Sequence, residues 1–210
     1  MKKKIHLINY GFGNPASVKN ALEFLNYNCK IVDHNTNLSD ITHLILPGVG
    51  SFEAGIKTLQ KQKWDKKIKL LIKKNVKLLG ICLGMQLLFR TGHNEKSKKK
   101  VNGLKLINGT CESFFKSNKY KLPLPHVGFN KVDFKKSKIW NSSQKNSYFY
   151  FVHSHRVKII KEEKISTGIT NYGENFVSYV EKGNIFGAQF HPEKSNNSGL
   201  IFLKKFCELK

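Results

Sequence analysis

The chain has 210 residues, of which 40% are apolar, and this composition excludes a disordered chain and allows one domain, residues 1–210, with a sizeable core. Lysine and arginine total 37 against 14 acidic residues, a net charge of +23, while no apolar run approaches the length that spans a bilayer. The apolar stretch after the basic N-terminus is short and interrupted by Gly11, and the cysteine spacing fits neither a zinc site nor a disulfide framework, so we expect a cytoplasmic, reduced protein.

The N-terminal part of the chain alternates strand-like and helix-like segments. Asn14 followed by Pro15 is a typical helix start, and a helical apolar spacing follows it. The run 76–82, which is apolar except for Lys77, predicts a central strand buried on both faces. The other expected strands are 5–10, 29–34 and 43–47, and the other expected helices are 53–62, 64–74 and 84–89. This alternation predicts a parallel sheet with helices on both faces.

The C-terminal part has a different pattern. Residues 92–103 are polar and lysine-rich, which predicts a surface loop. Short β-like runs separated by Gly and Asn then predict an added antiparallel layer, and Ser198 is the expected cap of a last helix with Leu200, Leu203 and Cys207 on one face. The predicted fold class is therefore α/β, three-layered, with a mostly parallel central sheet, helices on both faces and an added antiparallel β layer.

The segment Gly80-Ile81-Cys82-Leu83-Gly84 has the spacing of a nucleophile elbow, with cysteine as the nucleophile. Such a strand-to-helix turn is so sharp that the residues two positions away on either side must be small. The following helix start favours a thiolate, and the Leu83 N–H can face a developing oxyanion. The alternative is a core cysteine at a strand end, the interpretation that we give to Cys29, Cys111 and Cys207.

A cysteine nucleophile needs a base, and His191 is the strongest candidate among the eight histidines. It ends a short strand and is followed by Pro192 and Glu193. A carboxylate two residues after the imidazole can fix its tautomer and support its positive charge. Cys82, His191 and Glu193 together predict a Cys-His-carboxylate triad.

The turn Pro47-Gly48-Val49-Gly50 follows a neighbouring predicted strand. Its glycines allow backbone N–H groups to face an anion or to change orientation. The turn is therefore placed to complete an oxyanion hole beside Leu83, and an ordinary strand-end turn is the alternative.

Several motifs, in order along nearly the whole chain, resemble the glutaminase subunits of imidazole glycerol phosphate synthases, a family of class I, triad-type glutamine amidotransferases. The segments that carry the resemblance are INYGFGNPASVKNAL, PGVGSFEAG, GICLGMQLLF, PHVGFNKV, YFYFVHSHRV and GAQFHPEKS. The resemblance implies that Cys82 attacks the side-chain amide of glutamine, that His191 passes the proton to ammonia, and that Glu193 orients His191. It implies no metal or organic cofactor.

The same resemblance assigns the surroundings of the triad. Val49 and Leu83 match the oxyanion hole, with a Val49 peptide flip as a gate, and the positions that match the glutamine pocket are Gly50, Gln86, His153 and Ser154. The implied partner is a separate (β/α)8 cyclase subunit that uses the ammonia to make imidazole glycerol phosphate for histidine synthesis. The positions that match the partner face are Asn14, Phe129, Tyr150 and Lys194.

The chain departs from the usual family pattern toward the partner face and the pocket rim, where Asn9, Phe129 and His155 replace Asp, Trp and Tyr. The alternative acceptor is therefore the cyclase-like barrel of paralogues that supply ammonia for surface-polysaccharide sugars. Two further alternatives are a stand-alone cysteine hydrolase and a basic nucleic-acid binder. The lysines are scattered, with one dense run at Lys96–Lys100, and this favours a solvated surface and no specific nucleic acid.

Overall fold

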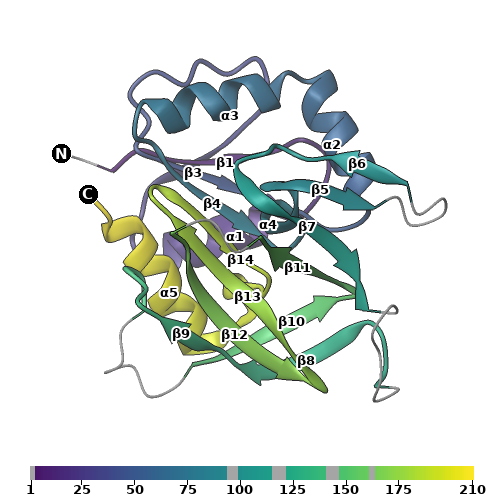
Figure 1. The fold of residues 1–210 in the computed structure, drawn as a ribbon. Coiled ribbons are helices and arrows are strands. Elements are labelled where there is room, and N and C mark those ends of the chain that lie inside the picture. Colours follow the sequence, from purple (N-terminus) through teal and green to yellow (C-terminus); the bar gives the residue numbers. More distant parts are fainter. Residues whose placement is uncertain (1–2, 94–98, 115–121, 141–146, 161–163) are drawn as a thin grey trace.

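The computed structural model describes residues 3–93, 99–114, 122–140, 147–160 and 164–210. Its N-terminal part alternates strands and helices, as the sequence predicts (Figure 1). The elements in this part are β1 (Ile5–Ile8), α1 (Pro15–Phe24), β2 (Cys29–Val32), β3 (His43–Leu46), α2 (Phe52–Lys61), α3 (Trp64–Lys73), β4 (Lys77–Ile81) and α4 (Leu83–Leu87). The Asn14 side chain accepts a hydrogen bond from the Ser17 N–H at 3.1 Å, and this cap fixes the start of α1 beside Pro15.

The C-terminal part consists mainly of strands and ends in a helix. Its elements are β5 (Phe89–His93), β6 (Lys100–Asn102), β7 (Ile107–Ser113), β8 (His126–Lys131), β9 (Asp133–Lys135), β10 (Tyr148–His153), β11 (His155–Ile159), β12 (Ser166–Tyr172), β13 (Glu174–Lys182), β14 (Ile185–Ala188), the 3-10 helix η2 (Pro192–Lys194) and α5 (Asn196–Glu208). No helix in the described ranges is both long and apolar enough to cross a bilayer.

The strands form one 12-stranded sheet and a separate two-stranded sheet. In the large sheet, β2, β1, β3, β4 and β14 are neighbours in that order and pair in parallel. Antiparallel pairing begins where β13 joins β14 and continues into β11, β12 and β7. The second sheet pairs β8 with β10 antiparallel. The predicted α/β class, with its mostly parallel centre and antiparallel addition, is confirmed.

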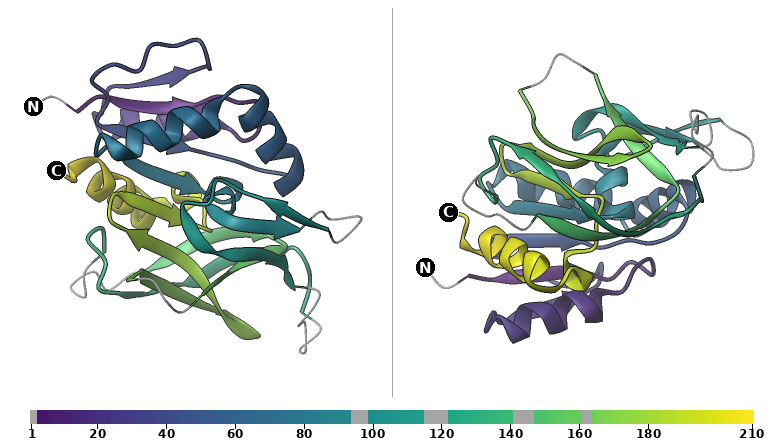
Figure 2. Two further views of the ribbon diagram at one scale, coloured as in Figure 1. Left: turned by 45° about the horizontal axis from the view of Figure 1, so that its top comes forward. Right: turned by 90° about the horizontal axis from the view of Figure 1, so that it is seen from below.

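Helices cover both faces of the parallel strands. α2 and α3 lie together on one face, while α1 and α5 lie on the other (Figures 1 and 2). After Lys77, β4 is apolar because both of its faces are buried: Leu78 belongs to the core cluster on the α2 and α3 side, whereas Leu79 and Ile81 belong to the cluster on the α1 and α5 side. The predicted central strand is therefore confirmed.

Two local predictions were wrong. Residues 92–103 are not simply a surface loop, because β5 and β6 pair as antiparallel strands through Thr91–His93 and Lys100–Asn102. Residues 94–98, which include two of the four lysines of the dense run, lie outside the described residues. The last helix begins at Asn196, and its N-cap is Ser195 rather than Ser198. The polar run offers several possible caps, and the hydroxyl of Ser195 donates to the His191 carbonyl at 2.6 Å, which ties this turn to the preceding segment. On the predicted face of this helix, Leu203 and Cys207 are fully buried, whereas Leu200 is half-buried.

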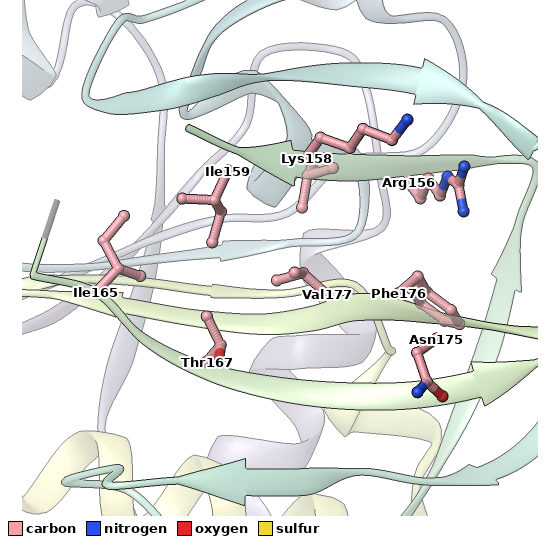
Figure 3. A pocket seen from close by; sticks show the side chains of 9 residues that line it. Arg156, Lys158, Ile159, Ile165, Thr167, Asn175, Phe176 and Val177 are labelled. Carbon is pink, nitrogen blue, oxygen red and sulfur yellow. The ribbon is translucent and has the colours of Figure 1, made fainter. Parts of the chain in front are cut away.

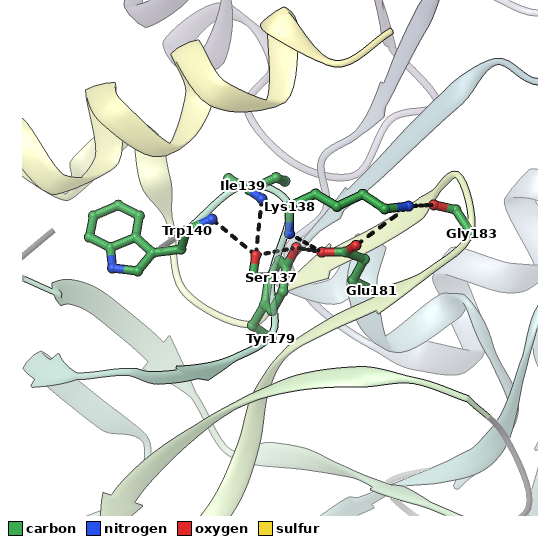
Figure 4. A network of polar contacts seen from close by, with 7 residues as sticks. All are labelled: Ser137, Lys138, Ile139, Trp140, Tyr179, Glu181 and Gly183. Carbon is green, nitrogen blue, oxygen red and sulfur yellow. Dashed lines mark hydrogen bonds and ion pairs between the residues drawn. The ribbon is translucent and has the colours of Figure 1, made fainter. Parts of the chain in front are cut away.

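A buried polar network attaches the segment after β9 to the end of β13 (Figure 4). Glu181 is 5% exposed and accepts hydrogen bonds from the Lys138 backbone N–H and the Tyr179 hydroxyl, both at 2.9 Å. Ser137 accepts from the N–H groups of Ile139 and Trp140. Because the Lys138–Glu181 and Ser137–Tyr179 hydrogen bonds join residues 43 and 42 positions apart, the network fixes this segment over the sheet.

Candidate active site

Cys82 lies on a sharp turn between β4 and α4, as the elbow pattern predicts. Its φ of 53° and ψ of −112° are strained for a residue with a side chain. The turn is held on both sides: the Cys82 N–H donates to the Ala188 carbonyl at 2.7 Å, and the Cys82 carbonyl accepts from the Gln86 N–H at 3.1 Å. The backbone of β14 and α4 therefore fixes the direction of the cysteine side chain.

The two glycines of the elbow are required by space. A Cβ on Gly80 would lie 2.6 Å from the Gly84 carbonyl oxygen, and a Cβ on Gly84 would lie 1.8 Å from the Leu46 carbonyl oxygen. Both obstacles are backbone atoms of the turn or of β3, which cannot move aside as a flexible side chain can. The steric reason for the Gly-x-Cys-x-Gly spacing is thus present in this structure.

His191 and Glu193 follow β14, which pairs in parallel with the strand that carries Cys82. The His191 Nδ1 atom lies 2.8 Å from the Glu193 Oε1 atom, and both side chains are 5% exposed. The His191 Nε2 atom is buried and has no hydrogen-bond partner within the described part of the chain. This leaves the imidazole oriented by a carboxylate on one side and able to exchange a proton on the other.

The electrostatic environment of His191 favours the imidazolium. Burial alone would lower the pKa of His191, but interactions with the Cys82 sulfur and with the Glu193 carboxylate outweigh burial and raise the pKa to about 10. His191 can therefore carry a positive charge beside the Cys82 sulfur. The other three cysteines are also buried, and burial raises the pKa of Cys29 to about 11 and that of Cys207 to about 12, which suits inert core thiols.

A family model for "Glutamine amidotransferase class-I" matches residues 6–207 of this chain. The chain belongs to the class I glutamine amidotransferases. Over 98% of its own length, the amidotransferase is 41% identical to "Imidazole glycerol phosphate synthase subunit HisH" of Caldanaerobacter subterraneus subsp. tengcongensis. The match covers 98% of that relative. It is 40% identical over 97% of its length to "Imidazole glycerol phosphate synthase subunit HisH 2" of Methanococcus maripaludis, also covered to 98%.

Among solved structures, "Structure of PurLQS from Thermotoga maritima" matches with a TM-score of 0.73 and 17% identity, covering 98% of each chain. "Crystal structure of a putative gmp synthase subunit a protein (ta0944m) from thermoplasma acidophilum at 2.45 A resolution" matches with a TM-score of 0.68 and 18% identity, over 99% of this chain and 93% of that one. These similarities show that the amidotransferase shares its fold with those proteins.

The predicted oxyanion turn lies directly against the elbow. The Gly48 carbonyl accepts a hydrogen bond from the Leu83 N–H at 3.2 Å, so the expected oxyanion donor already has a partner. Val49 is 48% exposed, and Gly50 has a φ of 103°, a conformation that favours glycine. In this state the Gly48–Val49 peptide presents its carbonyl, rather than its N–H, to the elbow.

The other predicted pocket residues lie on α4, at the end of β10 and directly after β10. Gln86 on α4 is 5% exposed, and its Nε2 atom donates to the Gln189 side-chain oxygen at 3.0 Å. His153 at the end of β10 is buried, and its Nε2 atom lies 3.0 Å from the His126 Nδ1 atom. Burial lowers the pKa of His153 to about 3. Ser154 is half-buried, and its carbonyl accepts from the Phe114 N–H.

β10 connects two of the predicted partner-face residues to the triad. The ring of Tyr150 lies 5.5 Å from that of Phe129 across the β8–β10 pair. The backbone of Tyr150 accepts from the His191 N–H at 2.9 Å and donates to the Ser195 hydroxyl at 2.9 Å. The other two predicted residues, Asn14 and Lys194, are exposed. They lie on segments that pack together, because α1 contacts η2.

A separate hollow of about 450 Å³ opens between β11, β12 and β13 (Figure 3). Its lining includes Arg156 and Lys158, but none of the predicted site residues. Both cations already contact carboxylates: Arg156 lies 3.2 Å from Glu112 and 2.5 Å from Glu174, and Lys158 lies 2.8 Å from Glu112. The hollow is therefore not the amidotransferase site, and its positive charge is balanced locally.

Sequence reasoning missed Gln189. Its side chain is fully buried, and its Nε2 atom lies 3.6 Å from the Cys82 sulfur. A signal was present, because Gln189 is a polar residue within the apolar run before His191 and lies two positions from that histidine. Within the described residues, no group of three or more His, Cys, Asp or Glu side chains is placed to hold a metal ion.

Proposed function

We propose that the protein is the glutaminase subunit of an imidazole glycerol phosphate synthase and supplies ammonia for histidine synthesis. The observation that carries this proposal is the oriented His191–Glu193 pair beside a cysteine on a strained elbow. The full-length similarity to HisH subunits supports the histidine pathway over the polysaccharide paralogues.

The proposed chemistry proceeds through a thioester. The Cys82 thiolate attacks the side-chain carbonyl carbon of glutamine, and the tetrahedral intermediate expels ammonia after His191 protonates the nitrogen. Water, deprotonated by His191, then attacks the thioester and releases glutamate and the Cys82 sulfur. Glu193 holds the His191 tautomer and stabilises its positive charge in both steps.

The oxyanion turn is proposed to be a gate. The negative oxygen of the intermediate needs hydrogen-bond donors, but in this structure the Leu83 N–H donates to the Gly48 carbonyl. Rotation of the Gly48–Val49 peptide would remove this carbonyl and direct the Val49 N–H toward the same place. Glycines on both sides of Val49 make the rotation sterically accessible. A closed turn in the isolated subunit would prevent glutamine hydrolysis when no ammonia acceptor is present.

The proposed partner is a (β/α)8 cyclase subunit that docks on the outer face of the β8–β10 sheet. This face exposes apolar side chains that a partner would cover: Val127 is 55% exposed, Phe129 47% and Tyr148 54%. Asn14 and Lys194 are proposed to extend the interface beyond the sheet. Because the Tyr150 backbone is bonded to the His191 turn, docking at this face can reach the triad.

Glutamate release from glutamine tests the proposal. We expect the purified chain alone to release almost no glutamate. The barrel cyclase from the same source, together with its nucleotide ligand, should strongly increase this release. Cys82→Ala should abolish hydrolysis while still folding and binding the cyclase. Absence of activation, with Cys82 still alkylated by a glutamine-analogue electrophile, would reject the histidine pathway and favour the polysaccharide partner. Absence of both would reject the glutaminase proposal.

A further inference from the structure

Two polar neighbours of the Cys82 sulfur have opposite hydrogen-bonding character. The Val152 carbonyl, 3.9 Å away, can only accept a hydrogen bond and so suits a protonated thiol. The Gln189 Nε2 atom, 3.6 Å away, donates and so suits a thiolate. Gln189 is thus the neutral donor that can compensate a negative sulfur when the proton resides on His191.

The orientation of the Gln189 amide is linked to Gln86. The Gln86 Nε2 atom donates to the Gln189 Oε1 atom at 3.0 Å, and this directs the Gln189 Nε2 atom toward the sulfur. If both amides turned over, the Gln189 oxygen would face Cys82 and would accept from a thiol instead. The pair therefore has one arrangement that suits each charge state of the sulfur.

The burial of Gln189 and Gln86 makes the loss of either amide contact costly. Gln189 is 0% exposed and Gln86 is 5% exposed, so water does not readily replace a lost amide partner. The backbone is fixed as well, because the Gln189 N–H donates to the Ser178 carbonyl at 2.9 Å. A hydrogen bond to an ionised acceptor is roughly twice as strong as one between neutral groups, and this favours the arrangement that serves the thiolate.

We propose that Gln189 is a positioning residue that stabilises the Cys82 thiolate by a hydrogen bond whose direction is set by Gln86. Because Gln86 matches a position of the glutamine pocket, this inference deepens the proposed function and rests on it for the link to the substrate.

Alkylation of Cys82 by iodoacetamide, followed by intact mass over about pH 5 to 9, tests the hydrogen bond, because the thiolate is the reactive form. We expect Gln189→Met to move the rate profile upward by about one pH unit, equal to roughly tenfold slower alkylation on its rising limb. Gln189→Glu, which keeps the shape but replaces the donor with a negative acceptor, should move it further. Gln60→Glu, an exposed change of the same kind on α2, should leave it unchanged.

The proposed coupling of Gln86 to Gln189 makes a second prediction. Gln86→Met should move the profile in the same direction but less, and adding it to Gln189→Met should have no further effect, because the two residues act in series. Cys82→Ala measures any alkylation at the other cysteines. An unchanged profile in a Gln189→Met protein with wild-type thermal unfolding would overturn the proposal. If Gln189→Met does not fold, an unchanged profile in Gln86→Met overturns it.

This outcome is separate from that of the proposed function. Iodoacetamide needs neither glutamine nor a partner, so the profiles remain decisive in a chain that hydrolyses no glutamine. Conversely, unchanged profiles in variants with normal partner-activated glutaminase activity would reject only the role of Gln189.

Discussion

At the residue scale, the nucleophile is directed by its backbone. The strained conformation of Cys82 costs on the order of 1–3 kcal/mol, and hydrogen bonds to Ala188 and Gln86 from two different elements maintain it. The base is directed differently, by a single carboxylate contact between His191 and Glu193. The direction of the nucleophile therefore depends on backbone hydrogen bonds to two elements, whereas the orientation of the imidazole depends on one side chain.

We expect Glu193→Gln to slow thioester formation by roughly 100-fold, because the amide can no longer stabilise the His191 imidazolium. The carboxylate is one of the groups that raise the pKa of His191, so this pKa should fall in the variant. Single-turnover glutamine hydrolysis with the partner present measures the rate, and histidine NMR measures the titration. Glu208→Gln, an exposed change of the same kind on α5, is the control. A wild-type rate would remove Glu193 from the mechanism.

At the element scale, the elbow was predictable from sequence because its constraint is local. Gly80, Cys82 and Gly84 lie within one turn, and their spacing alone indicates that the turn has no room for side chains at the two glycines. The contact of Gln189 with Cys82 was not predictable, because it joins residues 107 positions apart and depends on the register of β14 against β4. The β5–β6 pair was missed because its paired segments, Thr91–His93 and Lys100–Asn102, are too short and polar to show the apolar alternation that marks a half-buried sheet.

We expect Gly84→Ala to abolish glutaminase activity and to lower the thermal midpoint of unfolding. The new methyl group would lie 1.8 Å from the Leu46 carbonyl oxygen, so β3 and the elbow must separate, and overpacking of this kind typically costs about 1–3 kcal/mol or more. Gly183→Asn is the control, because a Cβ there meets nothing within 4 Å and asparagine tolerates its φ of 62°. A fully active Gly84→Ala enzyme would contradict the steric account of the elbow.

At the scale of the whole molecule, buried histidines make the fold sensitive to acid. Burial lowers the pKa of His43 to about 4 and that of His153 to about 3, whereas both residues titrate near 6.5 in the unfolded chain. The unfolded chain therefore binds protons below about pH 6.5 that the folded chain does not bind. Stability from this source is fully present above pH 6.5 and falls as the pH drops toward 4.

We expect each of these two histidines to remove about 2 kcal/mol of unfolding free energy between pH 7 and pH 5. Urea unfolding at both pH values, in wild-type and His43→Leu proteins, measures the difference. The variant should lose less stability on acidification by about that amount, whatever its stability at pH 7. His34→Leu, at an exposed position after β2, should retain the wild-type loss. Equal losses in all three proteins would show that His43 is not neutral in the fold.

The position of β14 in the sheet has a consequence for how the protein folds during its synthesis. β14 lies between β4 and β13, parallel to the first and antiparallel to the second, yet it is the last strand along the chain. During synthesis, β4 and its cysteine leave the ribosome long before the residues that will cover that edge. A nascent chain that ends before Ile185 thus has a bare strand edge and no base for its nucleophile. Closure of this sheet edge and completion of the triad therefore both require the same segment, which is made late in synthesis.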